Sequence, residues 1–175
     1  MTRRLLPCLF ALLFSLPLLG QVANPISSFL KQRLPDNEKH FVDSAELMPA
    51  EKYNYRPTPA QMTFGHAILH VSQSNVFLCS RISGAPAPKV EKLSDTDAKD
   101  KLIGALKDSF HYCSQVLAPL DDSKLGDEVD FFGGHKVARG AAMMVLLGDW
   151  YDHYAGLAIY LRLNGILPPT ARPAK

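Results

Sequence analysis

The stretch from about Lys136 to Leu163 most constrains the fold, because it predicts a long helix that is apolar around much of its circumference. Residues 141–147 are apolar throughout, and a helix of this kind is typically buried at the centre of its domain. A loop containing Gly133 and Gly134 precedes it, and Asn164-Gly165 followed by a proline pair forms a firm C-terminal stop. We therefore expect this helix to pack among others.

Three further helices are predicted from apolar periodicity and from the residues that begin and end helices. The first runs from about Ile26 to Leu47, and Pro35 is expected either to break it or to delay its start. The second has the clearest start, because Thr58-Pro59-Ala60-Gln61 offers a threonine N-cap, a proline at the first helical position and a reciprocal glutamine. It is expected to end near Ile82.

The third helix is expected to begin near Ser94 or Thr96 and to stop at Pro119. Its apolar residues recur in steps of four and three. No stretch alternates convincingly enough to predict a strand. Four helices joined by modest loops indicate an all-α, up-and-down four-helix bundle that occupies residues 22–175 as one domain.

The first twenty residues differ in kind from the rest of the chain. Arg3 and Arg4 precede an almost uncharged apolar run from Leu5 to Leu19, which is too short to span a bilayer comfortably but suits a secretory signal. Residues 1–21 are therefore predicted to be a signal peptide, with an uncleaved anchor as the alternative. The expected location is periplasmic or extracellular, with no stable membrane anchor once the leader is removed.

The charge of the chain argues against a nucleic-acid partner. The formal net charge is +2, from 19 basic and 17 acidic residues, and the lysines between residues 89 and 107 are interleaved with acidic side chains. Nucleic-acid-binding proteins usually carry a basic stripe or cluster. We expect no nucleic-acid partner, whereas a small-molecule substrate and a homodimer remain open.

Two pairs of polar side chains have the spacing of a metal site. His66 and His70 are four residues apart in the second predicted helix, and Asp149 and His153 are four apart in the fourth. Residues at this spacing share one helical face, so two facing helices could aim all of them at one point. The alternative is that the histidines are hydrogen-bonded core or groove residues and that Asp149 pairs with a base.

Several segments of the chain resemble the DinB-like (DinB/YfiT) superfamily, in its exported branch. The resemblance rests on residues 48–59 (MPAEKYNYRPTP), Thr63-Phe64-Gly65, His70-Val71, Cys79-Ser80, His153-Tyr154, residues 160–166 (YLRLNGI) and Pro168-Pro169. It covers nearly the whole chain after the leader. It implies a four-helix bundle and, in many members, a divalent metal held by three histidines.

Carried over to this sequence, the resemblance assigns metal ligands to His70 and His153, but Asp149 stands where the family has a histidine. A set of two histidines and one carboxylate can bind zinc, nickel, manganese or iron. The departure could equally mark a site that has decayed. His66 is a candidate substitute ligand or proton-transfer group, and Asp152 is a candidate base or a solvated carboxylate.

Two cysteines, Cys79 and Cys113, follow the leader. In an oxidising compartment such a pair often forms a disulfide, although two buried thiols are the alternative. Cys79 lies nine residues after His70, about half a turn around the helix, so it should face away from the metal candidates. A disulfide that joins the second and third helices is therefore preferred.

Two functions of different kinds follow as hypotheses. The first, which the resemblance implies, is a metal-dependent enzyme, either a hydrolase or a thiol transferase, in which the metal activates water or a thiol. The second is a non-catalytic module that binds a metal or an apolar ligand between its helices. The sequence names no substrate, and no organic cofactor is expected.

Overall fold

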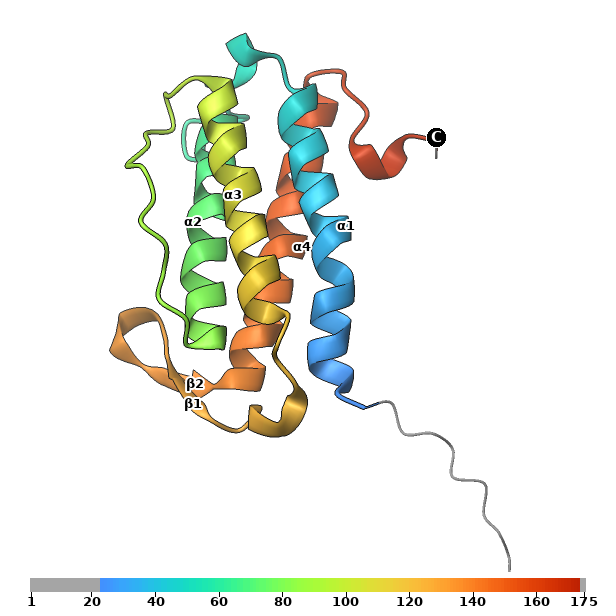
Figure 1. Ribbon diagram of the computed structural model, residues 1–175. Helices are drawn as coiled ribbons and strands as arrows, with labels where there is room; N and C mark the ends of the chain where they lie inside the picture. The colour runs from blue at the N-terminus through green and yellow to red at the C-terminus, as the bar shows by residue number, and fades with distance from the viewer. Residues whose placement is uncertain (1–22, 174–175) are drawn as a thin grey trace, which may run out of the picture.

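The computed structural model describes residues 23–173, which form four long helices and a small β-hairpin (Figure 1). The predicted signal peptide lies outside the described residues. The prediction of an all-α four-helix bundle is confirmed. The helices are α1 (Pro25–Leu47), α2 (Phe64–Ser83), α3 (Lys99–Leu117) and α4 (Arg139–Leu163).

The expected up-and-down order was wrong for one pair of helices, because α2 and α3 do not alternate in direction. The connection over residues 84–98 runs back along the bundle, so α2 and α3 point the same way (Figure 1). Two links between α2 and α3 show that these helices are parallel. Asn75 donates a hydrogen bond to Ser109, and Cys79 forms a disulfide with Cys113. Both pairs have a sequence separation of 34, which stays constant only when two helices run in the same direction. Helix α4 packs against α1 and α2, opposite α3. This arrangement places the metal candidates of α2 and α4 on neighbouring helices.

Helix α1 is continuous, so the expected break or late start at Pro35 was wrong. Pro35 lies on the exposed side of the helix, where water can hydrate the carbonyl that loses its intrahelical donor. The first turn is capped from outside the helix. Both carboxylate oxygens of Asp122 accept backbone N–H groups, from Ile26 at 2.9 Å and from Ser27 at 2.8 Å.

Helix α2 begins later than predicted, at Phe64, and its N-cap is Thr63 rather than Thr58. The Thr63 hydroxyl accepts the backbone N–H of His66 at 3.0 Å. The residues from Thr58 to Gln61 form an isolated turn, closed by a 3.1 Å backbone hydrogen bond. The start of α2 is instead fixed by the preceding segment, because the carbonyl of Tyr55 accepts the N–H of Phe64.

Helix α3 also begins later than predicted, at Lys99, because Ser94 and Asp97 close a turn of their own. The N–H of Ser94 donates to the Asp97 carboxylate at 2.7 Å, and the N–H of Asp97 donates to the Ser94 carbonyl at 3.1 Å. A helix cannot continue through this turn, since these groups bond to each other and Ala98 is extended.

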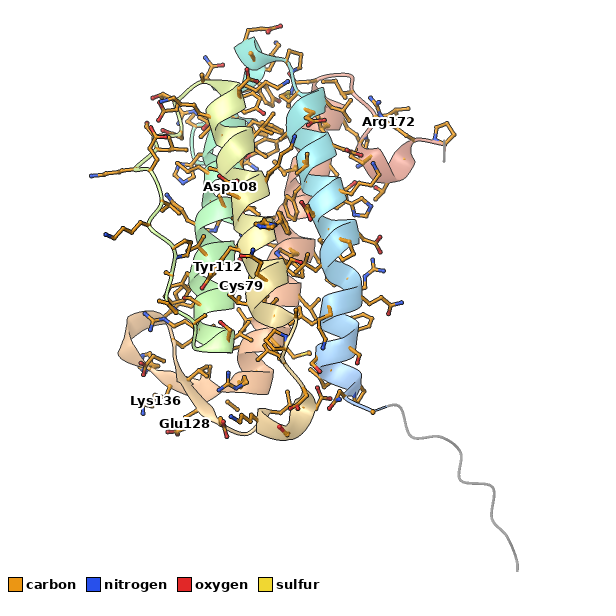
Figure 2. The ribbon with its side chains drawn as sticks, viewed as in Figure 1. Cys79, Asp108, Tyr112, Glu128, Lys136 and Arg172 are labelled. Carbon is orange, nitrogen blue, oxygen red and sulfur yellow. A yellow bond between two sulfur atoms is a disulfide. The ribbon has the colours of Figure 1, made fainter. Side chains whose placement is uncertain are left out.

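The expectation of no strand was wrong for one short hairpin. Strands β1 (Glu128–Asp130) and β2 (Lys136–Ala138) pair antiparallel, so α4 starts at Arg139 and not at Lys136. Lys136 and Glu128 form an exposed ion pair across the hairpin at 3.9 Å (Figure 2). Arg139 then ties the hairpin to the bundle by donating to the carbonyl of Ile82 at the end of α2.

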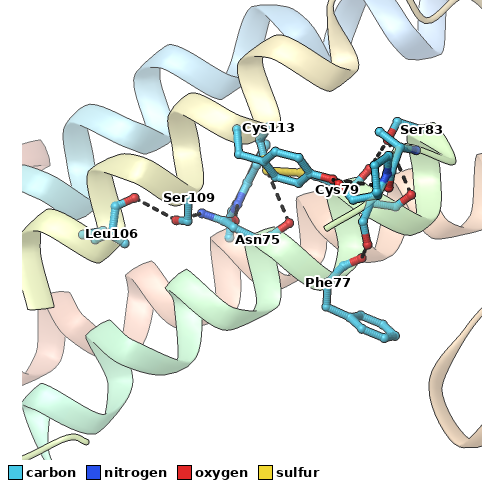
Figure 3. The surroundings of a disulfide bond; sticks show 12 residues. Asn75, Phe77, Cys79, Ser83, Leu106, Ser109 and Cys113 are labelled. Atoms are coloured by element: carbon cyan, nitrogen blue, oxygen red, sulfur yellow. Dashed lines mark hydrogen bonds between the residues drawn. A yellow bond between two sulfur atoms is a disulfide. The ribbon is translucent and has the colours of Figure 1, made fainter. Parts of the chain in front are cut away.

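The bundle core contains one chain of buried polar groups among its apolar side chains. The indole N–H of Trp150 donates to Asn75 at 2.7 Å. The amide of Asn75 donates to Ser109 at 3.0 Å, and the Ser109 hydroxyl donates to the Leu106 carbonyl at 2.7 Å (Figure 3). Asn75 and Trp150 are fully buried. Because every donor has a partner, these polar groups lock α2, α3 and α4 to one another.

The preferred pairing of the cysteines is found in the structure. A disulfide joins Cys79 of α2 to Cys113 of α3, and both residues are fully buried (Figure 3). The bond lies next to the buried polar chain, so a covalent link and a hydrogen-bonded one hold the same pair of parallel helices.

Candidate metal centre

Three predicted metal ligands come together between α2 and α4. One ligand atom from each of His70, Asp149 and His153 lies within 4.8 Å of the other two. Asp149 and His153 are one turn apart on α4, and α2 supplies His70 from the facing helix. The two imidazole rings meet edge to face, with centroids 4.6 Å apart. The helical spacing therefore brings His70, Asp149 and His153 to a common point, as the sequence predicted.

The Asp149 carboxylate is only partly used within the protein. Its Oδ1 lies 3.3 Å from Nε2 of His153, whereas its Oδ2 is buried and has no hydrogen-bond partner. The side chains of Asp149 and His153 are only 17% and 20% exposed. A buried carboxylate oxygen without a donor is costly, and a cation is one of the few groups that would satisfy it. The residues present thus fit a divalent cation.

The two histidines of the centre differ in their electrostatic surroundings. Burial lowers the pKa of His70, and the nearby His153 lowers it further against the opposing effect of Asp149. The hydrogen bond to Asp149 raises the pKa of His153, although burial opposes the change. His70 therefore favours the neutral form that binds metals, whereas His153 holds its proton more strongly in the metal-free protein.

The structure adds one neighbour that the sequence analysis missed. The hydroxyl of Ser74, one turn after His70 on α2, lies 3.4 Å from Nε2 of that histidine. Ser74 is almost fully buried, so it can restrict the rotation of the His70 ring. Its position four residues after a predicted ligand was the signal available in the sequence.

The two candidates for proton transfer are not part of the three-residue group. His66 is exposed, and its Nδ1 lies 3.4 Å from the carboxylate of Asp95 in the connection before α3. Its candidacy as a substitute ligand is not supported, because the ring pairs with this loop residue. Asp152 is exposed on α4, where its charge raises the pKa of His153. It can influence the centre from the solvent side.

The histidines outside the three-residue group have other surroundings. His40 stacks on Tyr154 with ring centroids 4.9 Å apart, and burial lowers its pKa. The Tyr154 hydroxyl is bonded to Thr170 at 2.9 Å. His111 is exposed on α3, and Trp150 is fully buried.

Two shallow grooves on the surface lie away from this centre, between α1 and α3. One is lined by Glu46, Lys99 and Lys107, and the other by Glu38, Asp43 and His111 among others. Both carry side chains of mixed charge, and neither includes a residue of the metal group. The two grooves are therefore not part of the candidate metal centre.

Within the described part of the chain, no helix combines the length and apolarity needed to cross a bilayer.

Comparison with solved structures supports the fold. A DinB-like protein from Bacillus subtilis is 19% identical, with a TM-score of 0.66, and the match covers 83% of this chain and 99% of that one. A DinB-like protein from Bacillus cereus ATCC 10987 is 14% identical, with a TM-score of 0.66, over 81% of this chain and 95% of that one. At these identities the likeness shows the fold alone.

A third similar structure is that of a mycothiol-dependent maleylpyruvate isomerase. It is 15% identical, with a TM-score of 0.60, and the match covers 75% of this chain but only 60% of the isomerase. No curated protein matches the chain. The family model described as the DinB superfamily matches residues 34–155, a span that contains His70, Asp149 and His153. The chain therefore belongs to the DinB superfamily.

Proposed function

We propose that this protein is an exported enzyme that binds one divalent metal ion through His70, Asp149 and His153 and hydrolyses a small-molecule substrate. The observation that carries the proposal is the buried, unpartnered Oδ2 of Asp149 beside two imidazoles. Two nitrogen ligands and one oxygen ligand form a set that zinc, nickel, manganese and iron accept.

Three protein ligands would leave a bound metal with an open position. A metal in such a site lowers the pKa of a bound water or thiol and so supplies a nucleophile near neutral pH. The chain's own residues have supporting roles in this proposal. Ser74 orients His70, Asp149 orients His153, and Asp152 supplies negative charge from the solvent side.

Hydrolysis is preferred to thiol transfer because of the proposed location. The isomerase with a similar fold is mycothiol-dependent, which makes thiol transfer the second variant. Low-molecular-weight thiols are scarce outside the cytoplasm, whereas water is always present. Export itself is supported by the apolar leader and by the Cys79–Cys113 disulfide, since disulfides persist in oxidising compartments.

The alternative is a non-catalytic binding module. It is favoured by the position of His66, which is paired with Asp95 and leaves the centre without an independent base on α2. A binding module would hold the metal yet turn over no substrate.

The first experiment measures the metal content of the purified protein by mass spectrometry. We expect about one equivalent of metal in the parent and a large loss in a His70→Ala, His153→Ala double variant. His111→Ala is the matched control, because His111 is exposed on α3 and its ring bonds to Gln115 of the same helix, away from the centre. No metal in the parent, even after incubation with zinc, nickel, manganese or iron, would refute the metal site.

The second experiment tests for catalysis with the metal-loaded protein. Ester, amide and phosphoester substrates are screened for hydrolysis, and electrophiles are screened with added thiols. Turnover that disappears in the double variant supports the enzyme. Full metal occupancy without turnover in either screen would favour the binding module.

A further inference from the structure

Two adjacent phenylalanines in the loop of the hairpin pack on the last turns of α2. The ring of Phe132 stacks on the ring of Phe77, with centroids 4.4 Å apart and an angle of 21° between the planes. Phe131 meets Phe132 edge to face at 4.7 Å, and its centroid lies 6.3 Å from that of Phe77. We call Phe77, Phe131 and Phe132 the aromatic surface. It lies at the end of the bundle where the hairpin meets α2 (Figure 1).

The aromatic surface and the candidate metal centre share one face of α2. In steps of four, three and four residues, this face carries His70, Ser74, Phe77 and Arg81. Residues at these steps are neighbours on the surface of a helix. At a rise of 1.5 Å per residue, Phe77 lies about 10 Å along the helix from His70. A small molecule can therefore reach from the metal centre to the aromatic surface.

Helix α4 contributes an apolar side chain between the two. The start of α4 lies at the end of α2, where Arg139 donates to the carbonyl of Ile82, so these helices run in opposite directions (Figure 1). Val145 precedes Asp149 by one turn and therefore lies on the side of the metal centre that faces the hairpin. It is 42% exposed. The path from the centre to the aromatic surface is thus apolar on its α4 side.

Packing of the hairpin on the bundle does not account for all of the aromatic surface. Val129 of β1 is buried and Phe131 is half-buried, whereas Phe132 is 52% exposed. Within the described residues, nothing covers the outer part of the Phe132 ring. An exposed aromatic ring attracts a second ring, because the negative face of one suits the positive edge of the other. The free part of Phe132 therefore favours an aromatic ligand.

A positive charge borders the aromatic surface. The guanidinium carbon of Arg81 lies 5.2 Å from the centroid of the Phe77 ring, and the side chain is exposed. Among residues 23–173, Arg81 forms no ion pair with a carboxylate. A guanidinium in this state can form two parallel hydrogen bonds with the anionic group of a ligand. Charge and ring together favour a ligand that is both aromatic and anionic.

We infer that the aromatic surface and Arg81 bind the part of the substrate that does not react, and that this part is an aromatic ring with an anionic substituent. The inference rests on the proposed function. It narrows the substrate class to small esters and amides that contain such a ring. A purely apolar ligand would leave Arg81 unused, and an anion without a ring would leave Phe132 exposed.

The first test measures binding to the metal-free protein, so its result does not depend on catalysis. The probes are phenylacetate, its neutral amide phenylacetamide, and cyclohexylacetate, which keeps the charge but has no aromatic ring. Titration followed by nuclear magnetic resonance gives each dissociation constant and the residues that respond. We expect phenylacetate to bind more tightly than either of the other probes.

Two substitutions separate the ring from the charge. Phe132→Ala should raise the dissociation constant of phenylacetate about 3- to 10-fold, because one aromatic contact is lost. Arg81→Gln should raise it by about the same factor and leave the binding of phenylacetamide unchanged. Phe29→Ala and Arg162→Gln are the matched controls, since Phe29 is 47% exposed on α1 and Arg162 is exposed at the end of α4 far from the hairpin.

Both controls should bind phenylacetate like the parent, and circular dichroism checks that all four variants are folded. The inference would be overturned if cyclohexylacetate or phenylacetamide bound as tightly as phenylacetate. It would also be overturned if Phe132→Ala and Arg81→Gln bound phenylacetate with the affinity of the parent.

The second test distinguishes a failure of this inference from a failure of the proposed function. The His70→Ala, His153→Ala double variant should bind phenylacetate like the metal-free parent, so a missing metal site would refute the proposed function and leave this binding result intact. Monomethyl terephthalate and its neutral amide, methyl terephthalamate, are ester substrates that differ only in the anionic group. In the metal-loaded protein, Arg81→Gln should raise the KM of the first about 3- to 10-fold and leave that of the second unchanged. Hydrolysis of both esters with equal KM would overturn the inference alone.

Discussion

The indole N–H of Trp150 donates a 2.7 Å hydrogen bond to Oδ1 of Asn75, and both side chains are fully buried. Trp150 directly follows Asp149, and Asn75 directly follows Ser74. The bond therefore fixes the rotation of α4 relative to α2 beside the metal group. A buried polar contact of this kind is specific, because α4 can satisfy it in only one orientation.

Replacing Asn75 by alanine should destabilise the protein by about 2–4 kcal/mol, because it leaves the Trp150 N–H buried without an acceptor and creates a small cavity. Urea unfolding measures the change. Ser109→Ala is the comparison, since it leaves the bond between Trp150 and Asn75 in place and should cost less. An Asn75→Ala variant as stable as the parent would contradict this account.

Gly65 is predicted to tolerate no side chain. A Cβ there would lie 2.6 Å from the backbone oxygen of Asp95 and 3.3 Å from that of Tyr53. We expect Gly65→Ala to cost about 1–3 kcal/mol, although alanine favours helices. Gly104→Ala, with open space around its Cβ, should instead be neutral or stabilising by up to about 1 kcal/mol. Equal effects in thermal unfolding would show that the contact with Asp95 is unimportant.

Removal of the disulfide should lower stability without loss of metal. Cys79 and Cys113 close a loop with a sequence separation of 34, for which chain entropy predicts a loss of about 3–4 kcal/mol in a Cys79→Ala, Cys113→Ala variant. The bond lies on the side of α2 that faces α3, away from His70, so metal content should persist in the folded variant. Urea unfolding and metal analysis test the two halves separately.

The helices could be predicted from the sequence because their ends are marked by residues with strong local effects. Helix α2 ends at Gly84, which has a positive φ, and α3 ends before Pro119. The starts were harder, since Thr58 and Ser94 have the chemistry of helix caps yet close separate turns. The turns closed between Thr58 and Gln61 and between Ser94 and Asp97 replace helix caps at these positions, and the residue pattern of a cap does not distinguish the two outcomes.

The three ligands of the candidate site could also be predicted from the sequence, whereas the orientation of His66 could not. Helical spacing brought His70, Asp149 and His153 to one point, because positions four apart share a face whatever the rest of the fold does. The orientation of His66 depends on Asp95, which lies 29 residues later in an irregular segment. The hairpin was missed because strands of three residues are too short to show an alternation.

The pH dependence of the metal-free protein should follow its two central histidines in opposite directions. The hydrogen bond to Asp149 holds the pKa of His153 above 6.5, so its stabilising contribution is complete below the unfolded pKa and is lost as pH rises through the folded pKa. Burial holds the pKa of His70 below 6.5, so the unfolded chain gains its proton first and stability falls as the pH drops below that value.

Nuclear magnetic resonance titration of the imidazole protons separates these effects. We expect Asp149→Asn to lower the pKa of His153, because the neutral amide no longer stabilises the imidazolium. Asp152→Asn is the control for charge without a hydrogen bond and should cause a smaller fall, since Asp152 acts on His153 only through its field. If both substitutions moved the His153 titration equally, the contact between His153 and Asp149 would have no special part in the centre.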